Sequence, residues 1–322
     1  MFITGTGTKM LWIKESEFGN TPTSKVSSSL INLTSEGLST SVEKGDEGNL
    51  LASKTATTRD LLSITVSGSV SSILRPEFTD ILLESSMGKS EEVTSETIPT
   101  GYSQKKYTLG DPAAALPSFS CFLNRGTGYK TYSGLTINTL SIEAAANDYV
   151  KVSDDLMGYK ESDSYLSSSD ASTLSAITYS KPSYRCTKAE MKIADKVYDV
   201  ETCTLSLSNN LVEAPKVYSS GLYSGQPQPA QREVTASFNI PYSDDIETLK
   251  NSYLVTETNA ELVLRFTTSD ANEFIEVTLP NIALTSVTNN VSGTGLVEAS
   301  VEATALSVGS AEPITIVVQS KS

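Results

Sequence analysis

Three segments of the chain alternate apolar and polar residues, which is the pattern of a strand with one face in a core and the other in water. They cover residues 63–70, 233–240 and 297–304. In the second segment the two sets separate cleanly: Val234, Ala236, Phe238 and Ile240 against Glu233, Thr235, Ser237 and Asn239. A parallel, doubly wound sheet would show continuous apolar runs instead. The pattern predicts antiparallel sheets with one polar face.

A short helical pattern follows each of the first two strands. Residues 76–88 begin with Pro76, carry early acids, and end at Gly88, which favours the left-handed conformation that stops a helix. Residues 244–254 begin with two acids and continue with an apolar stripe at helical spacing. We therefore predict one short helix after each strand.

The two strand–helix units are related by a shift of 168 residues, which carries Val66 to Val234 and Phe78 to Ile246. A later strand pair, residues 135–144 and 149–155, has a counterpart in residues 281–287 and 296–306. We predict an internal duplication in which each unit contains a strand, a helix and a long hairpin. Chance similarity between Ser/Thr-rich strands is the alternative.

The length of 322 residues agrees with about two domains at roughly 150 residues each. Residues 1 to about 50 alternate weakly, which indicates an extended arm outside the core, and residues 159–183 are rich in Ser, Asp and Tyr, which indicates a loop or a small insertion. The predicted division is an arm at 1–59, a first domain at 60–158, a linker or insertion at 159–199, a second domain at 200–318 and a tail at 319–322.

The composition argues against catalysis and against tight binding of nucleic acid. The chain has no histidine, 24 Lys and Arg residues and 38 Asp and Glu residues, so its net charge is −14. Histidine-dependent nucleophiles and metal sites are excluded, and the charge disfavours the neutralisation of phosphates. Cys121, Cys186 and Cys203 lack the spacing of a redox pair or a zinc site, so we expect reduced thiols. We predict no enzyme activity, no cofactor and no metal.

No stretch of the chain approaches the roughly 20 apolar residues of a membrane helix, and the first residues do not resemble a signal peptide. We therefore expect no contact with a membrane and synthesis in the cytoplasm.

Four stretches, taken in order, carry a family resemblance: residues 61–70 with the helix after them, 132–142 with 149–152, 205–211 with 234–238, and 277–282 with 296–306. Their order resembles that of the tail tube (major tail) proteins of long-tailed bacteriophages. The resemblance implies a mainly β fold of duplicated β-sandwich or barrel domains, each with one short flanking helix. It further implies that copies join into a continuous β-barrel ring around a channel for DNA.

The resemblance also implies where the protein acts and with what partners. The protein is expected to be a structural virion protein of the tail, made in the host cytoplasm, whose stacked rings form a tube for DNA ejection. Two tube domains per chain imply a trimeric, pseudo-hexameric ring, with a hexamer of chains as the alternative. Other implied partners are the tape measure protein, the tail terminator, and baseplate or tip proteins, while DNA passes without specific binding.

Strand parity predicts which side chains face the channel, because alternate residues point to opposite faces. The predicted channel residues are Ser63, Thr65, Ser67, Ser69, Glu143, Glu233, Thr235, Ser237, Asn239, Glu298, Ser300 and Glu302. An acidic wall lined by hydroxyls would repel phosphates. The alternative is that these acids lie on an outer solvent face. We also expect both long hairpins to pair with strands of neighbouring subunits, since an isolated hairpin is marginal in water.

Two other classes of function remain open. One is a β-sandwich surface module that binds carbohydrate or mediates adhesion, which the single tryptophan, Trp12, disfavours. The other is an enzyme, which the absence of histidine and of a catalytic motif disfavours.

Overall fold

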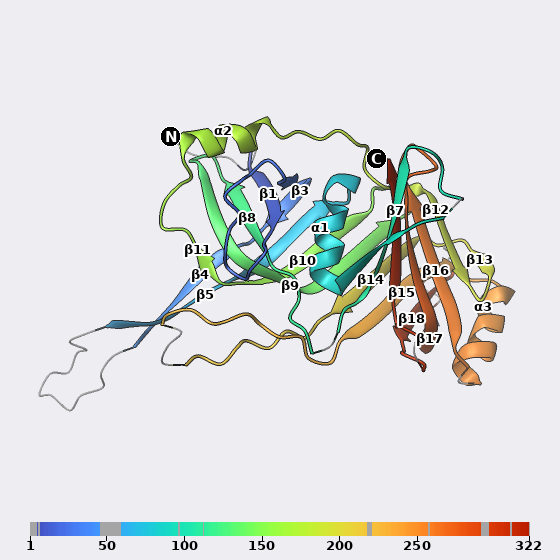
Figure 1. Cartoon of the computed structure of the whole chain (residues 1–322). Coiled ribbons are helices and arrows are strands. Elements are labelled where there is room, and N and C mark those ends of the chain that lie inside the picture. The colour runs from blue at the N-terminus through green and yellow to red at the C-terminus, as the bar shows by residue number, and fades with distance from the viewer. Residues whose placement is uncertain are drawn as a thin grey trace, which may run out of the picture.

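The structure is a computed structural model, and it describes residues 5, 7–45, 59–95, 97–111, 113–217, 221–256, 258–290, 296–309 and 311–321. The fold is mainly β, as predicted (Figure 1). The first half contains β1 (Lys9–Lys14), β2 (Ser29–Leu30), β3 (Leu33–Glu36), β4 (Ser39–Gly45), β5 (Asp60–Ile73), α1 (Pro76–Met87), β6 (Gly88–Val93), β7 (Tyr102–Leu109), β8 (Phe119–Asn124), β9 (Tyr129–Ala145), β10 (Lys151–Gly158), β11 (Lys160–Glu161) and α2 (Ser168–Ala176). The second half contains β12 (Arg185–Ile193), β13 (Lys196–Tyr198), β14 (Thr202–Ser208), β15 (Glu233–Pro241), α3 (Asp244–Leu249), its π-helical extension η1 (Lys250–Val255), β16 (Ala260–Thr267), β17 (Phe274–Asn290), β18 (Glu298–Ala305) and β19 (Thr315–Lys321).

One continuous antiparallel sheet, which we call the long sheet, joins the two halves. Its order is β4–β5–β10–β9–β14–β15–β18–β17, and β3 continues the line of β4 along β5. Within the described residues, β4 and the second part of β17 each have a strand partner on one side only. The long sheet is therefore open within one chain and does not close into a barrel.

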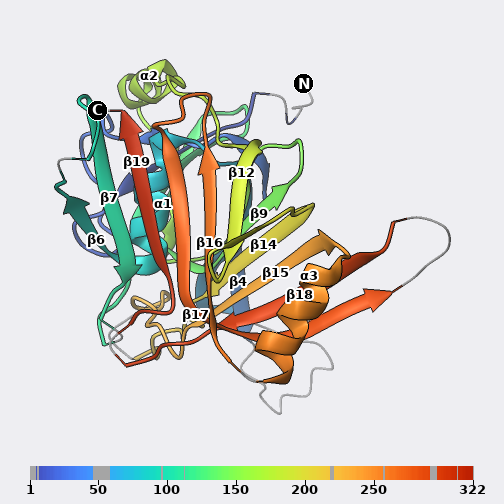
Figure 2. The same ribbon diagram turned by 90° about the vertical axis from the view of Figure 1, so that its right-hand side faces the viewer.

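A second sheet packs against each half of the long sheet (Figures 1 and 2). The first is formed by β2, β1, β8, β9 and β11, and the second by β13, β12, β16, β17, β19, β7 and β6. The long strands β9 and β17 belong to both layers, because their first parts pair in a covering sheet and their last parts pair in the long sheet.

The two halves repeat the same set of strand pairings. The strand before the helix lies between an earlier strand and the hairpin: β5 lies between β4 and β10, and β15 between β14 and β18. The register agrees in detail, since Asp154 of β10 pairs with Val70 of β5, and Val301 of β18 pairs with Phe238 of β15. Val70 and Phe238 are separated by the same 168 residues that relate the two sequence patterns.

The predicted helices form where the end signals lie. Helix α1 has proline in its first turn and ends at Gly88, whose φ of 94° lies in the left-handed region. Phe78 and Leu82 on its apolar face are fully buried. Ile246 and Leu249 of α3 are buried in the same way in the second half. These helices close the sandwich in each half because their apolar faces enter the common core.

The expected N-terminal arm is wrong for residues 9–14, because β1 is a core strand. Met10 and Trp12 belong to the main core, whereas Leu11 and Ile13 belong to a second cluster with Leu174 of α2. A strand covered on both faces shows a continuous apolar run and not alternation, so the alternation pattern did not reveal it. Residues 185–198, expected in a linker, form β12 and β13 and pair with β16.

The expectation that both hairpins seek neighbours is wrong for the first one. The hairpin of β9 and β10 is already flanked by β14 and β5 of the same chain. In the hairpin of β17 and β18, β18 has β15 on its outer side. Residues 283–290 of β17 pair with β18 on one side and have no strand on the other side within the described part of the chain.

Candidate functional site

The long sheet has a core face and a polar face, and the predicted site residues lie on the polar face. Strand β15 illustrates the division, since Val234, Ala236, Phe238 and Ile240 are buried while Glu233 and Ser237 are exposed. The same alternation continues through β14 and β18. In β15 and β18, parity therefore predicted correctly which side chains enter the core.

Cross-strand register brings the predicted residues of both halves into common rows. One row reads Glu143, Thr204, Ser237, Glu302 and Ser286 across β9, β14, β15, β18 and β17. The next row reads Ala145, Thr202, Asn239, Ser300 and Thr288. Glu298 lies one row further, opposite Pro241. The structure thus brings together residues that are up to 159 positions apart in the chain, from Glu143 to Glu302.

A row of hydroxyl side chains runs beside these acids. It contains Ser71, Ser153, Ser141, Ser206, Thr235 and Thr304 on six successive strands of the long sheet. The hydroxyl oxygens of Ser71 and Ser153 are 3.3 Å apart, within hydrogen-bond distance. Sequence reasoning placed Thr235 on this face but missed the serines of β9, β10 and β14, although their parity would have identified them.

The residues predicted on β5 share this face but differ in exposure. Ser67 and Ser69 are exposed, and Thr65 is half-buried. Ser63 is buried, because Glu43 of β4 lies opposite and accepts a hydrogen bond from its hydroxyl at 2.8 Å. At the edge of the long sheet, Glu43 is therefore the accessible group in place of Ser63.

The charge of the polar face is predominantly negative. Across the described residues of the strands from β5 (from Ser63 on) to β17, the polar face carries one cation, Lys151. Its acids are Glu143, Asp155, Glu233, Glu298 and Glu302. Sequence reasoning missed Asp155, which is exposed on β10 in the same parity as Ser153. Lys151 lies opposite Glu143 and forms an ion pair with Asp148 at 2.7 Å. The summed field of such a surface repels polyanions.

The described residues offer no evident place for metal or redox chemistry. No group of three or more potential metal ligands occurs among them. Cys121, Cys186 and Cys203 are free thiols, and burial raises the pKa of Cys203 to about 12, which disfavours the reactive thiolate. In the described part of the chain, no helix has both the length and the apolar character to cross a bilayer.

Comparison with known proteins identifies the family. No relative was found among curated proteins. A family model described as "Phage tail tube protein" matches residues 5–305, which is nearly the whole chain. This match confirms the resemblance that the order of the segments indicated. The chain therefore belongs to the phage tail tube protein family, and it is a structural component of a virion tail that associates with itself into a tube.

Proposed function

We propose that copies of this chain join through the two open edges of the long sheet into rings, and that stacked rings form the channel through which DNA leaves the virion. The observation that carries this proposal is the continuity of the long sheet across both halves, with one polar face and two unpaired edges in the described residues. Strand addition at such edges satisfies backbone groups that otherwise face water.

The polar face lines the channel in this proposal. The opposite face is fully engaged in the core, so a ring closed by the long sheet has only this face free to form its inner wall. Hydroxyl rows give the wall hydrated, uncharged groups, and the acids repel the phosphates of DNA. DNA then slides without specific binding, and the chain needs no catalytic group or cofactor.

Three chains per ring follow from the repeat, because each chain supplies two similar units to a pseudo-hexameric barrel. In this proposal the two units are built around the predicted domains at 60–158 and 200–318. The first unit also takes β1 to β4 and the second also takes β12 and β13, while β6 and β7 join the covering sheet of the second unit through β19. A ring of six chains is the alternative. The tape measure protein, the tail terminator and the baseplate or tip proteins are the further partners of the proposed tube, and synthesis in the host cytoplasm precedes its assembly.

Electron microscopy of the purified chain tests the proposal. We expect hollow rings or tubes whose projections show three-fold or pseudo-six-fold symmetry. Monodisperse small particles under all assembly conditions would contradict the proposal and favour a monomeric surface module. A tube reconstruction with Glu298 and Glu302 on the exterior would instead assign the acids to a solvent face that maintains solubility.

A further inference from the structure

One strand pairing inside the chain has the same surroundings as the two unpaired edges of the long sheet. Inside the chain, β9 of the first half pairs antiparallel with β14 of the second half, and we call this pairing the internal seam. Its strands have counterparts at the two free edges. β14 lies beside β15 as β4 lies beside β5, and β9 forms a hairpin with β10 as β17 does with β18. The two free edges thus repeat the two strands that meet in the internal seam.

The register of the repeats assigns the residues of that second seam. Leu207 of β14 pairs with Val234, and Thr40 of β4 pairs with Val66, so Thr40 is the counterpart of Leu207. Each long hairpin has one bulge, which leaves Asn138 of β9 and Thr285 of β17 without a paired residue. Aligning the bulges makes Val287 the counterpart of Leu140. Both alignments are read from hydrogen-bonded register and not from sequence similarity.

The internal seam pairs Leu207 with Leu140. On the basis of the proposed function, we infer that Val287 of one copy pairs with Thr40 of a second copy, in an antiparallel junction between β17 and β4. The same register sets Thr288 opposite Ser39 and Ser286 opposite Ser41. Because the two edges differ, the contact is heterologous, and it closes into a ring when the rotation between copies permits.

An exposed apolar residue at the edge supports this junction. Val42 on β4 is 47% exposed, and its counterpart by register is Asn209, which is fully buried in the internal seam. The amide of Asn209 donates to the carbonyl oxygen of Ile137 at 3.0 Å, and the counterpart of Ile137 is Leu284. The junction therefore places Val42 beside the backbone of Leu284 of the adjoining copy, where the second strand covers it and removes apolar surface from water.

At two positions of the free edge a polar side chain replaces an apolar one of the internal seam, and this difference helps to keep the edge soluble before assembly. At the internal seam, Cys203 and Leu207 point into the core. Their counterparts at the free edge are Glu36 and Thr40. Charged or polar groups on an edge strand oppose unspecific pairing with other sheets. The free edge thus combines a specific register with protection against aggregation.

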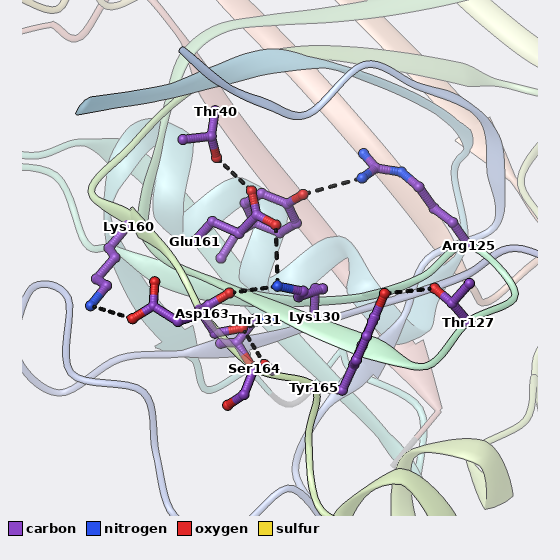
Figure 3. Close-up of polar contacts among 12 residues, drawn as sticks. Thr40, Arg125, Thr127, Lys130, Thr131, Lys160, Glu161, Asp163, Ser164 and Tyr165 are labelled. Carbon is purple, nitrogen blue, oxygen red and sulfur yellow. Dashed lines mark hydrogen bonds and ion pairs between the residues drawn. The ribbon is translucent and has the colours of Figure 1, made fainter. Parts of the chain in front are cut away.

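A set of side chains, which we call the edge cluster, holds this strand in place. Arg125 donates to both carboxylate oxygens of Glu36 at 2.7 Å and to the carbonyl oxygen of Leu38 at 2.7 Å. Thr40 donates to Glu161 at 2.6 Å, and Glu161 forms an ion pair with Lys130 at 3.8 Å (Figure 3). The edge cluster comprises Glu36, Thr40, Arg125, Lys130 and Glu161. It orders β3 and β4 before a second copy arrives, which lowers the ordering cost of association.

Disulfide trapping in assembled material tests the register. Two double variants place cysteines in the proposed register: Ser39→Cys with Thr288→Cys, and Ser41→Cys with Ser286→Cys. Two further double variants combine the same positions out of register: Ser39→Cys with Ser286→Cys, and Ser41→Cys with Thr288→Cys. Directly opposed residues lie within the Cα separation of a disulfide, whereas diagonal neighbours lie near or beyond its limit. The parent, which retains the buried Cys121 and Cys203 and the half-buried Cys186, and the four single-cysteine variants are the controls.

We expect both in-register pairs to lose the monomer band on non-reducing gels and to form a covalent ladder that ends at the trimer. An internal control, Ser141→Cys with Ser206→Cys, cross-links within one chain and produces no ladder. Rings or tubes that trap only the out-of-register pairs, or neither kind, overturn the register but leave the proposed function intact. If parent and variants form neither rings nor cross-links, the proposed function fails and the inference fails with it.

Discussion

Asp154 of β10 and Val301 of β18 occupy the same position in the two repeated hairpins, and both are completely buried. Their strand neighbours correspond as well: Val70 and Leu140 for Asp154, and Phe238 and Val287 for Val301. Neither carboxylate oxygen of Asp154 has a hydrogen-bond partner among the described residues. One half of the molecule thus carries an unsatisfied acid where the other half carries a branched alkyl group.

This acid makes the stability of the chain depend on pH. Burial, and secondarily the neighbouring Asp155, raise the pKa of Asp154 well above its ordinary value. The folded state therefore binds a proton more tightly than the unfolded state. The contribution of Asp154 is most favourable below the unfolded pKa of about 3.9 and is lost as pH rises through the folded pKa.

We expect Asp154→Val to raise the free energy of unfolding near pH 7.5 by about 1–3 kcal/mol, because it removes an unsatisfied buried polar group. The gain should shrink toward pH 4, where the parent carboxyl is protonated. Urea unfolding of both chains between pH 4 and pH 8 measures this effect. Asp155→Val keeps the buried acid, so its stability should retain the pH dependence of the parent, weakened only by the loss of the secondary effect of Asp155 on the pKa of Asp154. Equal destabilisation by Asp154→Val at every pH would indicate a hidden hydrogen-bond partner.

The sign of the channel charge should control the passage of DNA. Glu298→Lys combined with Glu302→Lys changes the polar face by four charge units and leaves the core face of β18 unaltered. We expect tubes to assemble, and DNA ejection from virions carrying this variant to slow, most strongly at low salt where screening is weakest. Ejection kinetics at two salt concentrations measure the effect.

A matched control separates channel charge from total charge. Glu261 and Glu312 are exposed and lie outside the polar face, so Glu261→Lys with Glu312→Lys makes the same change in net charge elsewhere. We expect this variant to eject DNA at the parental rate. Equal slowing by both double variants, or by neither, would contradict the assignment of the polar face to the channel.

The edge cluster should control how readily the chain assembles. Arg125→Met leaves Glu36 without its guanidinium partner on a strand that is paired on one side only. We expect faster hydrogen exchange in β3 and β4 and slower assembly, with little change in the rest of the chain. Lys151→Met, which removes a cation from the polar face, is the control. Assembly at the parental rate by Arg125→Met would show that the edge is ordered without the cluster.

The ion pair between Arg125 and Glu36 should also make the order of β3 and β4 depend on pH. The hydrogen bond from Arg125 holds the pKa of Glu36 below its ordinary value. A carboxyl with a lowered folded pKa stabilises the fold above its unfolded pKa of about 4.3, and this contribution is lost as pH falls through the folded pKa. We expect the exchange rate of β3 and β4, corrected for the intrinsic effect of pH, to rise below about pH 4 in the parent. In Glu36→Gln the exchange rate of β3 and β4 should be high already at pH 7.

Sequence patterns predicted those features that depend on alternation and on end signals. Val234 to Ile240 revealed both faces of β15, and Pro76 and Gly88 marked both ends of α1. The shift relating Val66 to Val234 recurs in the register of the long sheet. These properties are local, so a single sequence is sufficient to detect them.

Features that depend on distant partners escaped prediction. Trp12 faces the main core, while Leu11 and Ile13 on the other face of β1 pack with Leu174 of α2. Nothing near Trp12 in the sequence reports those distant partners. The pairing of β12 with β16 depends on residues more than 60 positions apart. Asp154 follows the polar pattern of a surface strand, yet register places it in the core face. The polar face of the strands was predicted better than the edges of the sheet, because parity fixes the face of a side chain and long-range pairing fixes the edges.

Assembly should protect two edges and leave an equivalent hairpin unchanged. β9 and β10 have strand partners on both sides within one chain, so their amides should exchange slowly before and after assembly. Residues 283–290 of β17 and the strand β4 have a partner on one side only in the described structure, so part of their amides should become protected only in the tube. Hydrogen exchange of the unassembled chain and of tubes, followed by mass spectrometry, measures this difference peptide by peptide. Because the two hairpins share one topology, each serves as the control for the other. New protection in β9 and β10 of the same size as in β17 would mean that the internal seam forms only on assembly, and it would remove the distinction between the two seams.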